Sequence, residues 1–167
     1  RLIEEFMITA NIAAARELIR LRQPVMFRIH DEPNREKFQE MREILAGFGV
    51  KLPKAKIYRP VDFNALLARI ADQPHARLIH ELVLRSQSQA EYNPNNIGHF
   101  GLGLRTYAHF TSPIRRYADL LVHRALINGL RLGTSTPPND ALPDDAGTTF
   151  SETGEHISAT ERRAISA

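Results

Sequence analysis

The stretch YAHFTSPIRRYADLLVHRALINGLR, residues 107–131, decides how this chain folds. Ser112 followed by Pro113 predicts the start of a helix, because a serine hydroxyl can cap free backbone N–H groups and proline suits the first helical position. Beyond this pair, apolar residues recur at steps of three and four, and no glycine interrupts the pattern before Gly129. The sequence therefore predicts a long, buried helix that begins at residue 112.

The first turn of this expected helix carries Arg115 and Arg116. The start of a helix is the positive end of its dipole, so each cation costs ~0.3–1 kcal/mol there unless an anion is also present. Two guanidiniums beside free N–H groups would form a phosphate site. In the alternative interpretation, Arg115 pairs with Asp119 one turn later and Arg116 is simply solvated. Spacing alone leaves both interpretations open.

The overall composition describes an ordinary soluble domain. The 167 residues are 43% hydrophobic and 25% charged, which is enough for one domain with a core. No apolar run approaches the ~18 residues of a membrane span, and no signal-peptide pattern is present, so we expect no membrane partner. The absence of cysteine excludes disulfides and thiolate metal sites and favours a cytoplasmic setting.

The charges are unevenly distributed along the chain. The formal net charge is +3, but residues 134–167 contain six acidic and only two basic residues. Residues 1–133 therefore contain 20 basic and 13 acidic residues, a net charge of +7. A basic body of this kind favours a polyanionic partner such as a nucleic acid.

The remaining patterns predict an α+β fold, rich in helices and with a few short strands. A segment rich in proline, glycine and aspartate predicts an exposed, mobile loop over residues 134–150. Residues 1–4 open inside a helical pattern without a capping residue, so we expect a piece of a longer chain. The predicted elements are helices over 2–22, 33–47, 62–74 and 75–87 and from about 151, a strand over 25–29, and two short strands within 88–106.

Two segments resemble a known family. The stretch HFGLGLRTYAHFTSPIRRYADLLVHRAL, residues 99–126, is similar to the signature of the ribonuclease II and ribonuclease R family, the RNB catalytic domain of processive 3′-to-5′ exoribonucleases. LIEEFMITAN, residues 2–11, resembles another helix of that family. The resemblance implies that residues 1–167 are the C-terminal part of an RNB domain. It also implies hydrolysis of single-stranded RNA to nucleoside 5′-monophosphates, and the remainder of the parent chain as a partner.

The resemblance assigns roles to individual residues. Arg115 falls on the catalytic arginine, which clamps the scissile phosphate and stabilises charge in the transition state, a role suited to a planar, permanently charged group. Arg116 falls on a basic position with a looser phosphate contact. Glu4 falls on a glutamate that accepts a hydrogen bond from the ribose 2′-hydroxyl, which DNA lacks. Three further residues are expected to contact RNA: Tyr107, His109 and Ser112.

Several of these residues have ordinary structural alternatives. Ser112 could serve as a helix cap alone. Tyr107 and Tyr117 could stack on bases, but their spacing from apolar residues is also typical of core positions. Asn11 matches the family pattern, and a role in helix packing or capping is equally open for it. His123 lies more than two turns along the helix, which favours a structural role.

A metal site is expected outside this segment. The family holds Mg²⁺ with a cluster of aspartates, and the ion activates the attacking water. No group of acidic residues in 1–133 resembles that cluster, and the seven histidines are scattered. We therefore assign no metal ligand here and expect the Mg²⁺ ligands upstream.

Two other functions compete with the exoribonuclease. One is an RNA-binding module that keeps the RNB scaffold without catalysis. The other is a helix-turn-helix DNA-binding protein, which the basic, helical composition would suggest. The helix expected from residue 112 lacks a short preceding helix with a tight turn, which argues against that motif.

Overall fold

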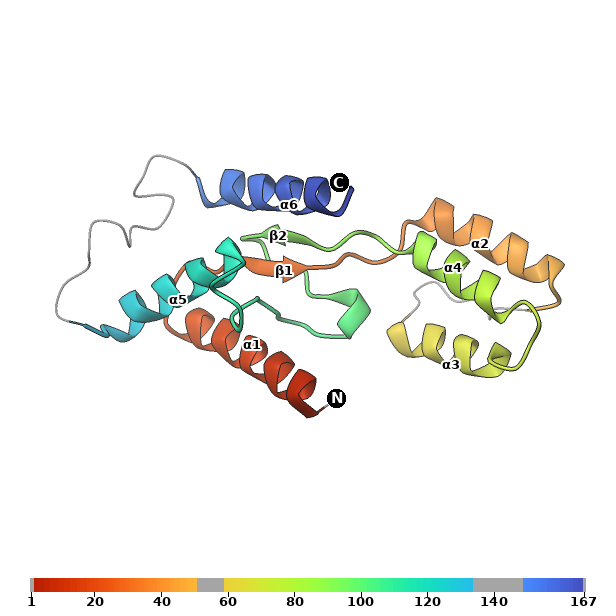
Figure 1. Cartoon of the computed structure of the whole chain (residues 1–167), viewed down its shortest axis with the longest axis horizontal. Helices are drawn as coiled ribbons and strands as arrows, with labels where there is room; N and C mark the ends of the chain where they lie inside the picture. The colour runs from red at the N-terminus through yellow and green to blue at the C-terminus, as the bar shows by residue number, and fades with distance from the viewer. Residues whose placement is uncertain (1, 51–58, 134–148, 167) are drawn as a thin grey trace. The chain divides into compact units, whose positions relative to one another are not determined.

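The structure is a computed structural model, and it describes residues 2–50, 59–133 and 149–166. The described residues confirm the predicted α+β fold, rich in helices and with short strands (Figure 1). No helix in these residues has the length and apolar character needed to cross a membrane. The elements in chain order are α1 (Leu2–Arg20), β1 (Phe27–Ile29), α2 (Arg35–Gly47), α3 (Pro60–Ile70), α4 (Ala76–Ser86), β2 (Glu91–Asn93), the 3₁₀ turn η1 (Phe100–Leu102), α5 (Tyr117–Leu130) and α6 (Phe150–Ser166).

The chain divides into two compact units. The first unit comprises Arg1–Ile29, Ala90–His99 and Leu104–Ala167, and it contains both strands and three of the helices. The second unit comprises His30–Gln89 and Phe100–Gly103, and it contains α2, α3 and α4. Most of the second unit is therefore inserted in the sequence between the two strands of the first.

A two-stranded antiparallel sheet organises the first unit. β1 pairs with β2 in a register that places Phe27 opposite Asn93 and Ile29 opposite Glu91. α6 packs along β2, and α1 packs against α5 (Figure 1). The apolar faces of these elements meet in one core because each helix buries a stripe of residues spaced by three or four. Its most deeply buried members include Ala15, Leu18, Met26, Ala108, Leu121 and Val122.

Close contact between α6 and β2 depends on small and polar residues of the helix. A Cβ atom added at Gly154 would lie 2.6 Å from the backbone oxygen of Tyr92. One turn later, the hydroxyl of Ser158 accepts the backbone N–H of Tyr92 at 2.8 Å. The helix backbone thus lies directly against the strand, with no room for a larger residue at position 154.

The second unit is a three-helix cluster whose helices follow local sequence signals. The Asn34 side chain caps α2 by accepting the backbone N–H groups of Glu36 and Lys37. Pro60 occupies the first position of α3, where its missing N–H costs nothing. The core comprises Phe38, Met41, Leu45, Val50, Phe63, Leu66, Ile70, Ile79 and Val83.

The predicted start of the helix at Ser112 was wrong. α5 begins at Tyr117, and residues 112–116 form a turn before it. The N-cap residue is Arg116, and the Ser112 hydroxyl makes no hydrogen bond with any residue that the structure describes. The physical reason is a local side-chain contact: the backbone N–H of Ser112 donates at 2.7 Å to the carboxylate of Asp119, seven residues later, and this holds the chain out of helical geometry.

The structure also differs from the prediction over residues 88–106, and it describes only the end of the loop expected over residues 134–150. Within 88–106 one strand forms, β2, and the second expected strand is replaced by η1 and an isolated bridge between His99 and Leu104. Residues 134–148 of the expected loop lie outside the described residues, while Phe150 already belongs to α6.

The helix order also argues against a helix-turn-helix motif. Such a motif joins two helices by a turn of about three or four residues. The helix that precedes α5 in the chain is α4, which ends at Ser86, and the segment between them contains β2 and η1.

Candidate phosphate-binding site at the start of α5

The turn over residues 112–116 presents Arg115 to solvent. The carbonyl oxygen of Ser112 accepts the backbone N–H groups of Arg115 at 3.3 Å and Arg116 at 3.2 Å, which closes the turn. Ile114 at its tip is fully exposed. Arg115 is exposed, and its guanidinium forms no hydrogen bond or ion pair with any residue that the structure describes. Its guanidinium is therefore available to an anion.

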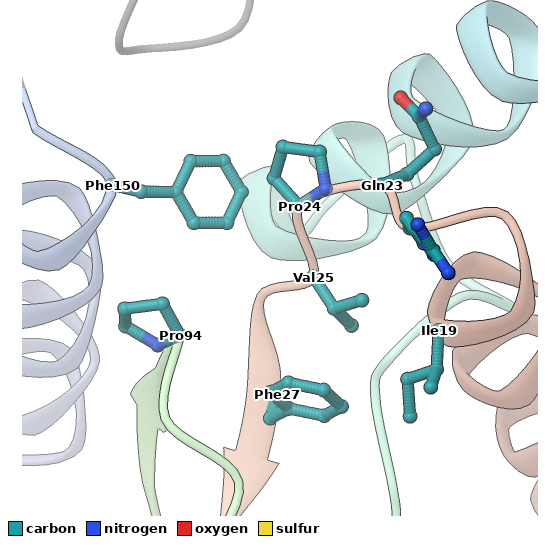
Figure 2. Close-up of a pocket in the computed structure, with 8 residues that line it drawn as sticks. Ile19, Gln23, Pro24, Val25, Phe27, Pro94 and Phe150 are labelled. Atoms are coloured by element: carbon teal, nitrogen blue, oxygen red, sulfur yellow. The ribbon is translucent and has the colours of Figure 1, made fainter.

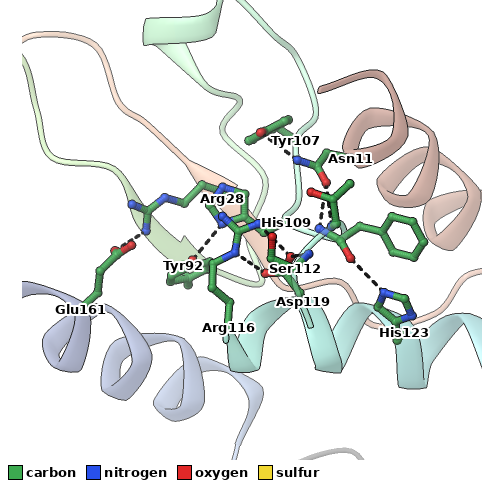
Figure 3. Close-up of polar contacts among 12 residues, drawn as sticks. Asn11, Arg28, Tyr92, Tyr107, His109, Ser112, Arg116, Asp119, His123 and Glu161 are labelled. Carbon is green, nitrogen blue, oxygen red and sulfur yellow. Dashed lines mark hydrogen bonds and ion pairs between the residues drawn. The ribbon is translucent and has the colours of Figure 1, made fainter. Parts of the chain in front are cut away.

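Arg116 has a different environment from its neighbour. Its Nη2 donates to Oδ1 of Asp119 at 2.9 Å, and its Nε lies 2.8 Å from Oδ2 (Figure 3). Its side chain is 20% exposed, and that of Asp119 is fully buried. The alternative pairing of Arg115 with Asp119 was therefore wrong, because the partner is Arg116. The expectation of a solvated Arg116 was wrong for the same reason.

The backbone amides of the turn are already hydrogen-bonded. Ser112 donates to Asp119, and Arg115 and Arg116 donate to the Ser112 carbonyl. Free N–H groups were part of the predicted phosphate site, and these three are not free. Anion binding at this turn would depend on the guanidinium of Arg115 rather than on its backbone.

Asn11 fixes the segment that leads into the turn. This residue of α1 is 3% exposed, and its Oδ1 accepts the backbone N–H groups of Phe110 at 2.9 Å and Thr111 at 3.2 Å. Its Nδ2 donates to the hydroxyl of Tyr107 at 2.9 Å (Figure 3). Nearly 100 residues separate Asn11 from these partners, so no local pattern in the sequence signals the contact.

Tyr107 and His109 point into the unit rather than into solvent. Tyr107 is 7% exposed, and its ring lies edge-on to His109, with centroids 5.6 Å apart. Nδ1 of His109 is hydrogen-bonded to the hydroxyl of Tyr92 at 2.9 Å. Tyr117 is 46% exposed and offers more ring surface to a base than Tyr107 does. RNA contact by Tyr107 and by His109 stays a prediction.

The environment of His109 favours its neutral form. Burial, followed by the positive charges of Arg116 and Arg28, lowers the pKa of His109 to about 3. Burial raises the pKa of Tyr92 to about 12, although Arg28 acts in the opposite direction. At neutral pH the phenol therefore keeps its proton and can donate to the imidazole. His109 could offer a phosphate an N–H group but no charge.

We expect His109 to remain neutral well below pH 6. The unfolded chain protonates its histidines near pH ~6.5. Unfolding should therefore take up one extra proton between pH ~6.5 and ~3, and stability should fall by up to about 1.4 kcal/mol per pH unit as pH decreases through that window. Ring chemical shifts measured by NMR, assigned with a His109→Gln variant, check this. Titration of the His109 ring near pH 6.5 would contradict it.

Arg28 was not predicted as part of the site and joins three elements of the first unit. Its guanidinium lies 4.5 Å from the ring centroid of Tyr92, and its Nη1 is 2.6 Å from Oε2 of Glu161 in α6. A cation over an aromatic face is stabilised by the ring quadrupole. The contact joins β1, β2 and α6 across 133 residues of sequence, which no sequence period could reveal.

A pocket of about 730 Å³ adjoins the turn. Arg115, Arg116 and Tyr117 form its rim on one side. The α6 side contributes His156, Ile157, Thr160, Glu161, Ala164 and Ile165. The pocket thus combines two guanidiniums and an exposed aromatic ring with apolar surface. Positive charge and a ring are what a phosphate and its attached base require.

A second pocket, of about 490 Å³, is mainly apolar (Figure 2). Its walls include Ile19, Phe27, Pro94 and Phe150, with Gln23 at its rim (Figure 2). No residue predicted to contact RNA lines it. We therefore place the candidate site at the Arg115 turn.

Two further expectations concern Glu4 and metal ligands. Glu4 lies exposed in the first turn of α1, and its carboxylate forms no hydrogen bond or ion pair with a described residue. In the described part of the chain, no group of three or more histidine, aspartate or glutamate residues could hold a metal ion. The described residues therefore do not fit a magnesium site.

Comparisons with known proteins agree with this architecture. The model of the RNB domain matches residues 1–131. Ribonuclease R of Escherichia coli (strain K12) is 44% identical over 169 residues, which cover 98% of this chain and 20% of that protein. Ribonuclease R of Aquifex aeolicus (strain VF5) is 41% identical over 162 residues, covering 97% of this chain and 22% of the relative.

Solved structures give the same result. The structure of Mycoplasma genitalium RNase R in complex with ribose methylated single-stranded RNA superposes with a TM-score of 0.86 at 28% identity, covering 98% of this chain and 26% of that one. The chain thus spans about a fifth of the length of the curated relatives that it matches. From the motif, the fold and these matches together, we conclude that the chain belongs to the RNB domain family.

Proposed function

We propose that this chain forms part of a processive exoribonuclease, which hydrolyses single-stranded RNA from its 3′ end to nucleoside 5′-monophosphates. The observation that carries the proposal is Arg115, an exposed guanidinium without a partner among the described residues, at the rim of a 730 Å³ pocket. The relatives named ribonuclease R, and the RNA bound in the Mycoplasma genitalium structure, support this choice of substrate.

Arg115 would bind the scissile phosphate and stabilise the charge that develops on it. A planar, permanently charged fork is suited to two phosphate oxygens at once. Arg116 is already engaged by Asp119, so it would make a looser contact with the RNA backbone. The Ser112 hydroxyl, at the start of this turn, and His109, three residues before it, would contribute neutral hydrogen bonds.

The proposal includes magnesium, with its ligands in the part of the full-length protein upstream of residues 1–167. The ion would supply activation of the attacking water and stabilisation of the displaced 3′ oxygen. The described residues offer no ligand cluster for it. The residues of this chain would instead bind and orient the RNA.

The test uses the full-length protein that carries this chain. RNA labelled at its 5′ end is incubated with and without Mg²⁺, and the products are separated by length. We expect a Mg²⁺-dependent ladder that ends in a very short core. RNA that is retarded but left uncut would instead show an RNA-binding module on an RNB scaffold without catalysis.

Glu4 should set the preference for RNA over DNA. A hydrogen bond to a charged group contributes about 1.5–3 kcal/mol, so its loss in Glu4→Ala should reduce the ratio of kcat/KM for RNA over DNA about tenfold or more. Glu5→Ala is the matched control, because Glu5 is also an exposed acidic residue of the first turn of α1. Unchanged discrimination in Glu4→Ala would remove Glu4 from the proposed site.

A further inference from the structure

The carboxylate of Asp119 ties together the two ends of the turn that carries Arg115. Asp119 is 0% exposed. Its Oδ1 accepts the backbone N–H of Ser112, where the turn begins, and Nη2 of Arg116, where the turn ends. Arg115 lies between these two attachment points, and its guanidinium has no partner among the described residues.

This contact differs from ordinary capping, which Asp62 illustrates in α3. Asp62 follows its N-cap residue by three positions and accepts the N–H of that residue, Arg59, at 2.7 Å. Asp119 also follows an arginine N-cap by three positions, but its carboxylate reaches past Arg116 to the amide of Ser112. Both aspartates occur in the pattern R-x-x-D. Asp62 caps its own helix, whereas Asp119 holds the turn over residues 112–116, which precedes its helix.

The chain is held just as firmly on the side that precedes the turn. Asn11 accepts the amides of Phe110 and Thr111, and Asp119 accepts the next one, that of Ser112. Three consecutive backbone N–H groups are thus bound by buried side chains of α1 and α5. A shift of this segment would leave a buried acceptor without its donor, which is unfavourable. The backbone is therefore held in place where the turn begins, at Ser112.

We propose that Asp119 is a positioning residue that places Arg115 for RNA cleavage, an inference that rests on the proposed function. Misplacement of a catalytic group by about 1 Å can lower a rate about 10²-fold. In this proposal Asp119 acts through Arg115 and does not touch RNA. Its replacement should lower kcat and leave KM largely unchanged.

The test is a double-mutant cycle in the full-length protein. Wild type, Asp119→Asn, Arg115→Ala and the double variant are compared by kcat and KM on single-stranded RNA. Asparagine keeps the size of the side chain but presents an amide to Arg116 in place of a carboxylate. We expect Asp119→Asn to lower kcat about 10- to 100-fold, with KM within about threefold. In the Arg115→Ala background it should lower kcat less than about threefold, because the positioned group is absent.

Asp62→Asn is the matched control and should leave kcat unchanged. If Asp119→Asn fails to fold, as judged by circular dichroism and gel filtration, Arg116→Lys takes its place. Lysine keeps a positive charge beside Asp119 but lacks the planar guanidinium that contacts both carboxylate oxygens. The loss of kcat in Arg116→Lys should likewise be smaller in the Arg115→Ala background. Equal losses in both backgrounds, or wild-type kcat in Asp119→Asn, would overturn the role of Asp119 and leave the exoribonuclease proposal standing. RNA left uncut by the wild type would overturn both.

Discussion

Replacing Arg115 by alanine in the full-length protein is expected to lower turnover about 10²–10³-fold, the range for loss of one preorganised charge-stabilising group. The reason is geometric. The turn fixes the backbone of Arg115. The Arg115 guanidinium has no partner among the described residues, so it is free to bind a phosphate. The affinity for RNA should change much less, because most of the binding energy comes from other contacts with the strand.

The measurement compares kcat and the dissociation constant for single-stranded RNA in the wild type and in Arg115→Ala. Arg20→Ala serves as the charge control, because it also removes one exposed guanidinium, from a surface pair with Glu17. That pair is of the exposed kind that contributes little to stability. Wild-type turnover in Arg115→Ala would remove this residue from the catalytic role.

Replacing Gly154 by alanine is expected to destabilise the first unit, although alanine is the better helix former. The intrinsic preference of alanine over glycine is about 1 kcal/mol in a helix interior. At this position the new methyl group would lie 2.6 Å from the backbone oxygen of Tyr92 and 3.2 Å from Sδ of Met26. A backbone atom in a sheet cannot move aside as a flexible side chain can, so overpacking should cost about 1–3 kcal/mol net.

Gly47→Ala provides the opposite case. Gly47 is the last residue of α2, and a Cβ atom added there meets nothing within 4 Å. The same substitution should be neutral or stabilising by up to about 1 kcal/mol. Urea denaturation of the two variants and the wild type gives the comparison. Equal stability of Gly154→Ala and wild type would mean that α6 is not packed against β2 as closely as described.

The second unit shows how much of the fold local signals predict. Asn34 marks the start of α2, and the apolar spacing of Phe38, Met41 and Leu45 marks its buried face. The helix expected over 62–74 begins two residues earlier, at Pro60, and ends at Ile70. These signals act within one or two turns of the chain, so the sequence alone reveals them.

The first unit shows where local signals fail. Ser112 and Pro113 are an ordinary helix start, but the Ser112 amide donates to the side chain of Asp119, seven residues later, and α5 begins only at Tyr117. The contacts of Asn11 cross about 100 residues, and those of Arg28 with Glu161 cross 133. Helical or strand periods carry no information about such partners. The sequence therefore predicted roles for Arg115 and Arg116, which line the 730 Å³ pocket, but not the side chains that hold their turn in place.

The strand register has a consequence for chain entropy. Because Ile29 pairs with the strand that begins at Glu91, the two ends of the intervening segment of about 60 residues are held one strand spacing apart. In polymer terms this segment is a single closed loop on the sheet. The cost of closing a loop grows only with the logarithm of its length, so a tenfold shorter connection would change it by about 2 kcal/mol. The length of the insertion can therefore vary at little entropic cost to the sheet beside which the candidate site lies.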